Sequence, residues 1–292
     1  MRIFDPHIHL TSRTTDDYEA MHAAGVRAAV EPAFWLGQPR TGVGSFADYF
    51  DSLIGWEPFR AAQHGIRHHC ALALNPKEAN DPRCTGVLDL LPRYLAKDSV
   101  VAVGEVGYDS LTPQEDEALA AQLALAAEFG LPVLVHTPHR DKLTGTRRTL
   151  DVLRESGLPP ERVLIDHLNE ETVGEVAGTG CWMGFSVYPY TKLDPARTAR
   201  ILAHHGVERM LVNSAADWGR SDPLSTVRTA EAMRAAGFDE DRIERVFWDN
   251  PVAFYSQSGK LETDISVPGG PRAAGQPVPA ATYLGNSLAR GG

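Results

Sequence analysis

The sequence predicts a (β/α)8 TIM barrel, in which eight parallel strands form a ring inside a layer of helices. Eight short apolar segments recur along the 292 residues, and helix-like segments separate them. The apolar segments are rich in Val, Ile, Leu and Ala, as is typical of parallel strands buried on both faces. This alternation favours a barrel, although an open doubly wound sheet alternates in the same way. The expected strands are 2–5, 27–32, 68–74, 100–106, 132–137, 162–167, 182–187 and 209–214.

Helix signals lie between these strands. Residues 112–128 carry Pro113 and acidic side chains in the first turn, and Gly130 follows the last turn. Proline at the start has no N–H to leave unpaired, acidic groups complement the helix dipole, and glycine is a stop signal. Further helices are expected at 144–155, 195–204 and 223–236.

Two stretches depart from this rhythm. Residues 35–59 are long for one connection and hold several glycines and aromatics, so we expect a lid or part of a substrate-binding wall there. Residues 263–292 are rich in Pro, Gly and Ala, a low-complexity composition with little apolar surface to offset the entropy of ordering. We therefore expect a barrel domain at 1–262 and a disordered C-terminal tail at 263–292.

Composition narrows the function classes. The formal net charge of −10 disfavours a protein that grips a nucleic-acid backbone, although a local basic patch remains compatible with it. The three cysteines are widely spaced and contain no CxxC pair, so neither a disulfide framework nor a cysteine zinc site is indicated. We find neither a secretion signal nor a stretch apolar enough to span a membrane. We expect a cytoplasmic enzyme with a small-molecule substrate and leave its oligomeric state open.

Ligand-type side chains stand at the ends of several strands. His7 and His9 end the first strand, and residues two apart on a strand point to the same face, where both imidazoles can reach one metal. Alone, this pair is equally well explained by two structural histidines. The carboxyl ends of parallel barrel strands, however, converge on one mouth. The other ligand-type residues at such ends are Glu105, His136, His167 and Asp217.

Four further residues are candidates for substrate contact. Glu31 and Asn75 end the second and third strands, and we expect both to point toward the mouth, Glu31 as a substrate contact or as the partner that orients a ligand histidine. His139 and Arg140 follow His136, where they would bind an anionic group. Structural hydrogen bonding and a solvated loop are the alternatives. Aromatic residues that would line the mouth are Trp35, Tyr188 and Trp218.

Four motifs resemble the TatD-related metal-dependent hydrolases of the amidohydrolase superfamily. They are DPHIHL at 5–10, GEVGYD at 104–109, VHT at 135–137 and NPVAF at 250–254, and the resemblance covers residues 1–255. It implies a (β/α)8 barrel with two divalent ions, and Zn²⁺, Mn²⁺ and Mg²⁺ all accept imidazole and carboxylate ligands. By the resemblance, one ion would be held by His7, His9 and Asp217, the second by His136 and His167, with Glu105 bridging them.

The sequence also departs from the nuclease pattern of that family. Residues 166–169 read DHLN, residues 214–218 read SAADW, and Asn75-Pro76 stands where the nucleases have a His-Pro pair. We therefore predict that the protein hydrolyses an ester, with a phosphoester as the first candidate, by means of metal-activated water. We do not predict DNA as the substrate. Asp217 and Glu105 would be the catalytic residues. The alternatives are a lactonase or amidase and a non-catalytic metal-binding scaffold.

Overall fold

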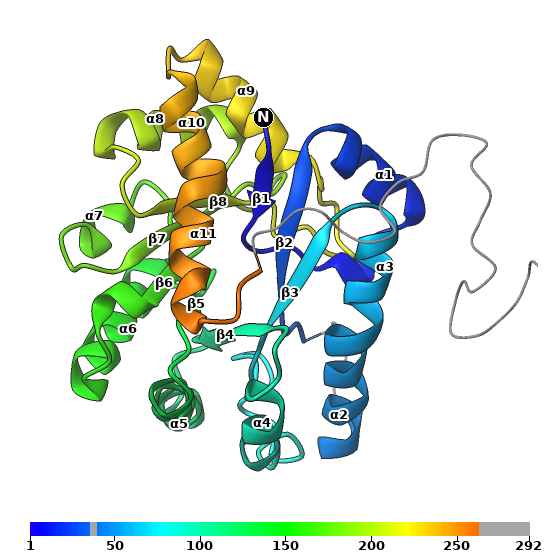
Figure 1. The fold of residues 1–292 in the computed structure, drawn as a ribbon. Helices are drawn as coiled ribbons and strands as arrows, with labels where there is room; N and C mark the ends of the chain where they lie inside the picture. Colours follow the sequence, from blue (N-terminus) through cyan, green and yellow to red (C-terminus); the bar gives the residue numbers. More distant parts are fainter. Residues whose placement is uncertain (36–39, 263–292) are drawn as a thin grey trace, which may run out of the picture.

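Eight parallel strands form one sheet in the computed structural model, which describes residues 1–35 and 40–262 (Figure 1). The strands follow one another around the sheet in chain order, and each pairs with the next. All eight predicted strands are confirmed, most within two residues of the expected bounds. They are β1 Ile3–Asp5, β2 Val26–Pro32, β3 Arg67–Leu72, β4 Val100–Gly107, β5 Val133–His136, β6 Val163–Asp166, β7 Trp182–Ser186 and β8 Met210–Asn213.

The sheet closes into a barrel just beyond β1 and β8. The N–H of Ala215 donates to the carbonyl of His7 over 2.9 Å, and the N–H of His9 donates to the carbonyl of Ala216 over 2.9 Å. An open doubly wound sheet would leave its first and last strands apart. The (β/α)8 barrel is therefore confirmed, and the first predicted ligands lie at its seam.

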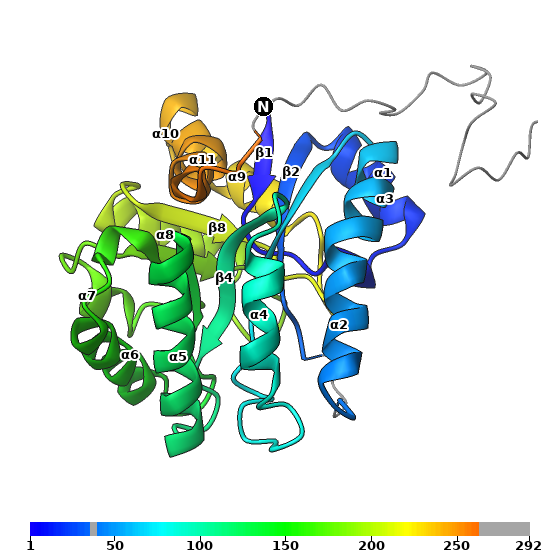
Figure 2. The ribbon, with the colours of Figure 1, turned by 60° about the horizontal axis from the view of Figure 1, so that its bottom comes forward.

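Helices form the outer layer, and the predicted ones are confirmed. Thr112 caps α5 by accepting a hydrogen bond from the Glu115 N–H, the Glu115 side chain accepts a bond from the Thr112 N–H, and Gly130 ends the helix at φ +64°. Figure 2 shows α4 and α5 outside β4, with α10 and α11 beside β1. The helices are α1 Thr15–Ala23, α2 Val43–Asp51, α3 Glu57–Gln63, α4 Val87–Leu95, α5 Pro113–Phe129, α6 Lys142–Ser156, α7 Val173–Val176, α8 Pro195–His205, α9 Ser225–Ala235, α10 Glu240–Glu244 and α11 Asn250–Tyr255.

The interior of the barrel is packed rather than open. Alternate strand residues such as Phe4, Val30 and Leu134 are buried there together with Phe254 and Tyr255 of α11. The rings of Phe4 and Tyr255 stack at 5.9 Å, and the Tyr255 hydroxyl donates to the carbonyl of Pro6 over 2.6 Å. Because α11 supports the start of the β1 loop from below, the loop can present its histidines at the opposite, carboxyl end of the strands.

The prediction of a lid at 35–59 is wrong for most of that stretch. Residues 43–63 form α2, one wider helical turn and α3, which together are the outer helical layer between β2 and β3 (Figure 1). Phe46, Phe50 and Leu53 are fully buried in the main core, so the segment cannot swing as a lid. Residues 36–39 and the predicted tail at 263–292 lie outside the described residues. No helix of the described ranges is both long and apolar enough to cross a bilayer.

Candidate metal centre

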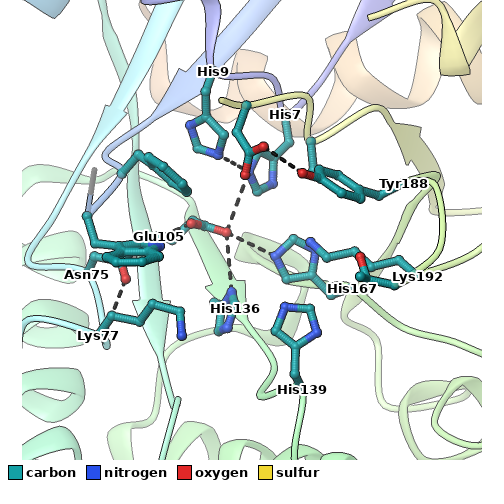
Figure 3. A pocket seen from close by; sticks show the side chains of 15 residues that line it. His7, His9, Asn75, Lys77, Glu105, His136, His139, His167, Tyr188 and Lys192 are labelled. Atoms are coloured by element: carbon teal, nitrogen blue, oxygen red, sulfur yellow. Dashed lines mark hydrogen bonds and ion pairs between the residues drawn. The ribbon is translucent and has the colours of Figure 1, made fainter. Parts of the chain in front are cut away.

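Four buried histidines and one buried glutamate meet in a cavity of about 600 Å³ at the carboxyl ends of the strands (Figure 3). They come from four different strands, and strand order brings them together although they span most of the chain. His7 and His9 follow β1, Glu105 lies in β4, His136 ends β5 and His167 follows β6. These five positions were all predicted from the sequence.

The first possible donor set consists of His7, His9 and Glu105. The Nε2 atoms of His7 and His9 face each other at 3.2 Å, and His7 Nε2 lies 3.5 Å from Glu105 Oε1. His7 Nδ1 lies 2.7 Å from Asp166 Oδ2. Since an ionised carboxylate only accepts, Nδ1 carries the proton and Nε2 keeps its lone pair for a metal. Burial and the neighbouring His7 lower the pKa of His9 to about 3, so its ring is neutral, the form that binds metals.

The second donor set consists of Glu105, His136 and His167. Glu105 Oε1 lies 3.0 Å from His167 Nε2 and 3.5 Å from His136 Nδ1. Both ring nitrogens of His136 are buried and make no hydrogen bond within the described part of the chain, and the same is true of His9 Nδ1. An unpaired buried imidazole is costly, and a metal ion is the partner that these nitrogens fit.

Glu105 belongs to both donor sets. Its Oε1 atom faces three imidazoles, while its Oε2 atom accepts a hydrogen bond from Asn75 Nδ2 over 3.1 Å. Burial alone would raise the pKa of this carboxyl, but His7, His136 and His167 outweigh it and lower the pKa well below the ordinary value. Glu105 is thus ionised and contributes to both donor sets.

Gly107, two residues after Glu105, makes the close approach of β4 to β5 possible. Gly107 has φ +127°, and a Cβ atom there would lie 2.3 Å from the carbonyl oxygen of His136. Any other residue would push β4 from β5 and separate Glu105 from His136. Gly107 is therefore a structural requirement of the site.

Asp217 lies in the same cavity but in neither donor set. Its Oδ1 atom accepts hydrogen bonds from the Tyr188 hydroxyl over 2.7 Å and from the Gly219 N–H over 2.7 Å. Arg13 donates to its backbone carbonyl. The structure thus places the predicted sixth ligand at the half-buried rim of the cavity, where Tyr188 holds it, and its role as a metal ligand stays a prediction.

Two of the four predicted substrate contacts reach the cavity. Asn75 and His139 line it, whereas Arg140 is exposed to solvent and does not. Burial and the charge of Lys192 lower the pKa of His139 to about 4, so His139 offers a neutral ring rather than a cation. The structure therefore does not bring Arg140 into the cavity, and its contact with an anion stays a prediction.

The prediction that Glu31 points toward the mouth is also wrong. Its carboxylate lies 2.9 Å from His68 Nε2 and accepts hydrogen bonds from the N–H and hydroxyl of Thr11. Side chains alternate along a strand, and its neighbour Val30 already points into the barrel. Glu31 must then face the helical layer, where it holds the β1 loop through Thr11 and not through a ligand histidine.

Sequence reasoning missed two lysines of the cavity, Lys77 and Lys192. Lys77 Nζ lies 2.5 Å from Asp109 Oδ1 and over the ring of Trp35. Lys192 Nζ lies 3.0 Å from His167 Nδ1. Each is a single lysine in a loop, which has no spacing pattern, and only the closed ring brings them near the histidines. Trp35 and Tyr188 line the cavity as predicted, while Trp218 stacks on Phe34 at 5.9 Å.

Comparisons with known proteins agree with this geometry. The sequence profile of the family described as TatD-related DNase matches residues 4–256. An uncharacterised metal-dependent hydrolase of Methanocaldococcus jannaschii is 29% identical over 257 residues, which is 87% of this chain and 99% of the relative.

Solved structures give the same result. A TatD-like protein from Archaeoglobus fulgidus superposes with a TM-score of 0.72 at 28% identity, covering 86% of this chain and 99% of the other. A phosphotriesterase homology protein from Escherichia coli, solved with phosphate in its active site, has a TM-score of 0.63 at 14% identity, over 87% and 98% of the chains. The second likeness shows the fold alone. The buried histidines, the shared glutamate and the match over nearly the whole barrel establish that the chain belongs to the TatD-related family of metal-dependent hydrolases.

Proposed function

We propose that the protein hydrolyses phosphoesters with water activated at two divalent ions. The observation that carries the proposal is the pair of donor sets that share Glu105, inside a cavity that also holds Lys77 and Lys192. Zn²⁺, Mn²⁺ and Mg²⁺ suit this mixture of imidazole and carboxylate. Paired ions of this kind lower the pKa of water and stabilise the charge that develops on phosphoryl oxygens.

The residues of the chain have separate tasks in this reaction. Asp217, held by Tyr188 and Gly219 at the rim, accepts the proton of the attacking water. The oxygen of that water bonds to phosphorus, the ester P–O bond breaks, and the leaving oxygen takes the proton from Asp217. Asn75 keeps Glu105 in place through its hydrogen bond to Oε2. The products are an alcohol and a phosphate group with one fewer ester bond.

One observation favours a nucleic-acid end as a second candidate substrate. The rings of Phe34 and Trp218 stack with an interplanar angle of 15°, and Trp218 is 55% exposed. His9 also packs against Phe34, with ring centroids 4.2 Å apart, so the aromatic pair adjoins the first donor set. Exposed aromatic faces beside a phosphoester site suit the stacking of an unpaired base. This observation agrees with the family description as a DNase.

The test is a substrate panel on metal-free and metal-reconstituted protein. It contains a phosphomonoester, a phosphodiester, a lactone and single-stranded DNA, with bound metal measured per chain. We expect phosphoester turnover that requires metal and that His136→Ala abolishes together with metal binding at the second donor set. His204→Ala, on the last turn of α8 and outside the cavity, is the matched control and should change neither. Turnover of the lactone alone would overturn the proposal, and so would metal binding without turnover of any substrate.

A further inference from the structure

Lys192 brings a charged group into the cavity without an acidic partner in contact. It lies in the loop between β7 and α8, and its Nζ atom reaches His167 Nδ1 at 3.0 Å (Figure 3). Among the described residues no carboxylate oxygen lies within ion-pair distance of it. Lys77, on the other side of the cavity, differs because it is paired with Asp109. An ammonium group that is removed from water and lacks a contacting anion is costly unless a ligand supplies the anion.

A second ammonium group stands behind the same histidine. Lys142 Nζ donates to the carbonyl of His167 over 2.8 Å and to the Thr137 hydroxyl over 3.0 Å. These acceptors are neutral, and the carboxylates of Asp166 and Glu171 act on Lys142 only through space. Two lysine side chains thus contact His167, in a chain whose overall charge is −10.

The carboxylates near Lys192 act on it only through space. Glu105, Asp166 and Asp217 are the carboxylates whose charges reach Lys192, and none of them forms an ion pair with it. These three carboxylates supply three negative charges, and two divalent ions would supply four positive ones. With the metals that the donor sets fit, the surroundings of Lys192 change from acidic to cationic.

The hydrogen bond between Lys192 and His167 is also incompatible with metal binding at His167 Nε2. A neutral imidazole that offers Nε2 to a metal must carry its proton on Nδ1. That proton has an acceptor in the Ser186 hydroxyl, 2.6 Å away. The Lys192 ammonium then has no acceptor at His167, and its N–H groups are free to bind a ligand in the cavity.

We propose that Lys192 is a specificity-determining residue that binds an oxygen of a terminal phosphate, so that phosphomonoesters are preferred over diesters. A monoester has three non-bridging oxygens and a diester two. Bound ions would supply positive charge to the oxygens that both esters share, and the third oxygen, present in the monoester alone, would accept the charge-assisted hydrogen bond from Lys192. The inference rests on the proposed function, of which it names the substrate class.

The test compares Lys192→Met with the parent protein and with Lys97→Met, a control that removes an exposed lysine just before β4, at the opposite end of the barrel. Calorimetry measures the binding of inorganic phosphate to each metal-loaded protein, and initial rates give kcat/KM for a phosphomonoester and a phosphodiester. Loss of one charge-assisted hydrogen bond lowers a binding affinity or a kcat/KM by about 10- to 100-fold. We expect Lys192→Met to lose that factor in phosphate affinity and in monoester kcat/KM, with diester kcat/KM changed less than about threefold.

Further measurements separate this role from a structural one. Lys192→Arg keeps the charge and should restore part of the monoester preference, while metal content and unfolding temperature should match the parent in both variants. Equal loss for monoester and diester, or unchanged phosphate affinity in Lys192→Met, would overturn the inference. If phosphate affinity falls as expected but no phosphoester is turned over, the anion site stands and the proposed function fails.

Discussion

At the scale of single residues, the buried carboxylate of Asp166 organises the candidate metal centre, and with His7 and His167 it forms a further possible donor set beside the two that share Glu105. Its oxygens accept hydrogen bonds from His7 Nδ1, from the His167 N–H over 2.7 Å and from Asn213 Nδ2 over 3.0 Å. Gly184 on β7 leaves room for it, since a Cβ there would lie within 2.4 Å of Asp166 Oδ1. One side chain thus fixes both the proton position of His7 and the backbone of His167.

We expect Asp166→Asn to reduce metal affinity, because an amide can donate to His7 Nδ1 and so permits the tautomer that has no lone pair on Nε2. Loss of such a partner lowers metal affinity about 10- to 100-fold. Metal content after dialysis against a series of free-metal concentrations measures the effect. Asp151→Asn on the exposed face of α6 is the matched control. An Asp166→Asn protein that retains metal as the parent does would remove this orienting role.

Asp217→Asn should lower turnover and leave metal binding nearly unchanged, which is the reverse of the effect expected for Asp166→Asn. Because Asp217 lies outside both donor sets and accepts its hydrogen bonds at the rim, metal content should change little. The amide cannot accept the proton of water, so we expect turnover to fall about 10²–10⁴-fold. Rates measured at matched metal occupancy give the comparison. Equal activity of the variant and the parent would exclude Asp217 as the proton acceptor.

At the scale of elements, the strands and the α5 helix could be predicted because their signals are local. Val, Ile and Leu runs mark the strands, and Thr112, Pro113 and Gly130 mark the ends of α5. The interpretation of 35–59 relied on its glycines and aromatics and overlooked a helical repeat. The buried residues Phe46, Tyr49, Phe50 and Leu53 recur at the spacing of one helix face.

The side chains of the site could be predicted only where a strand end fixes their direction. His7, Glu105, His136 and His167 are such cases. The prediction for Glu31 was wrong because the direction of its side chain depends on which residues of β2 point into the barrel. That register is not visible in one sequence. Lys192 could not be found, since its distance to His167 depends on the closure of the ring.

The helical interpretation of residues 43–63 makes a stability prediction. Phe50 is fully buried and packs edge-on against Tyr94 with ring centroids 5.2 Å apart. We expect Phe50→Ala to lower the free energy of unfolding by about 3–5 kcal/mol, as large core truncations do. Denaturant unfolding measures this, with Phe59→Ala, a partly exposed position on α3, as the comparison. A variant with unchanged stability and a raised KM would instead support a lid.

At the scale of the whole molecule, the last described residues lie against the amino-terminal side of the barrel. Lys260 Nζ donates to the carbonyls of Leu95 and Lys97 over 2.6 and 3.0 Å, and Glu262 pairs with Arg67 at 3.1 Å. We propose that these contacts close the barrel domain at residue 262, because the composition of residues 263–292 gives little apolar surface to bury.

Truncation after Glu262 should therefore leave the barrel intact. We expect an unchanged unfolding temperature and metal content, because every contact of Lys260 and Glu262 remains. A second truncation after Gly259 removes those contacts and should unfold at a lower temperature. If the chain cut after Glu262 fails to fold or to bind metal, then residues 263–292 contribute to the domain.

The seam between β1 and β8 has a consequence for synthesis. The first histidines leave the ribosome early, yet the carbonyl of His7 and the N–H of His9 find their partners only at Ala215 and Ala216. Asp166, which sets the proton of His7, lies 159 positions further along the chain. Contacts between residues so distant in sequence form late, because the long chain segment between them loses entropy when its ends are brought together. During most of its translation the nascent chain therefore has only part of the metal-binding site. Cations can bind to the complete site only after the eighth strand has emerged from the ribosome.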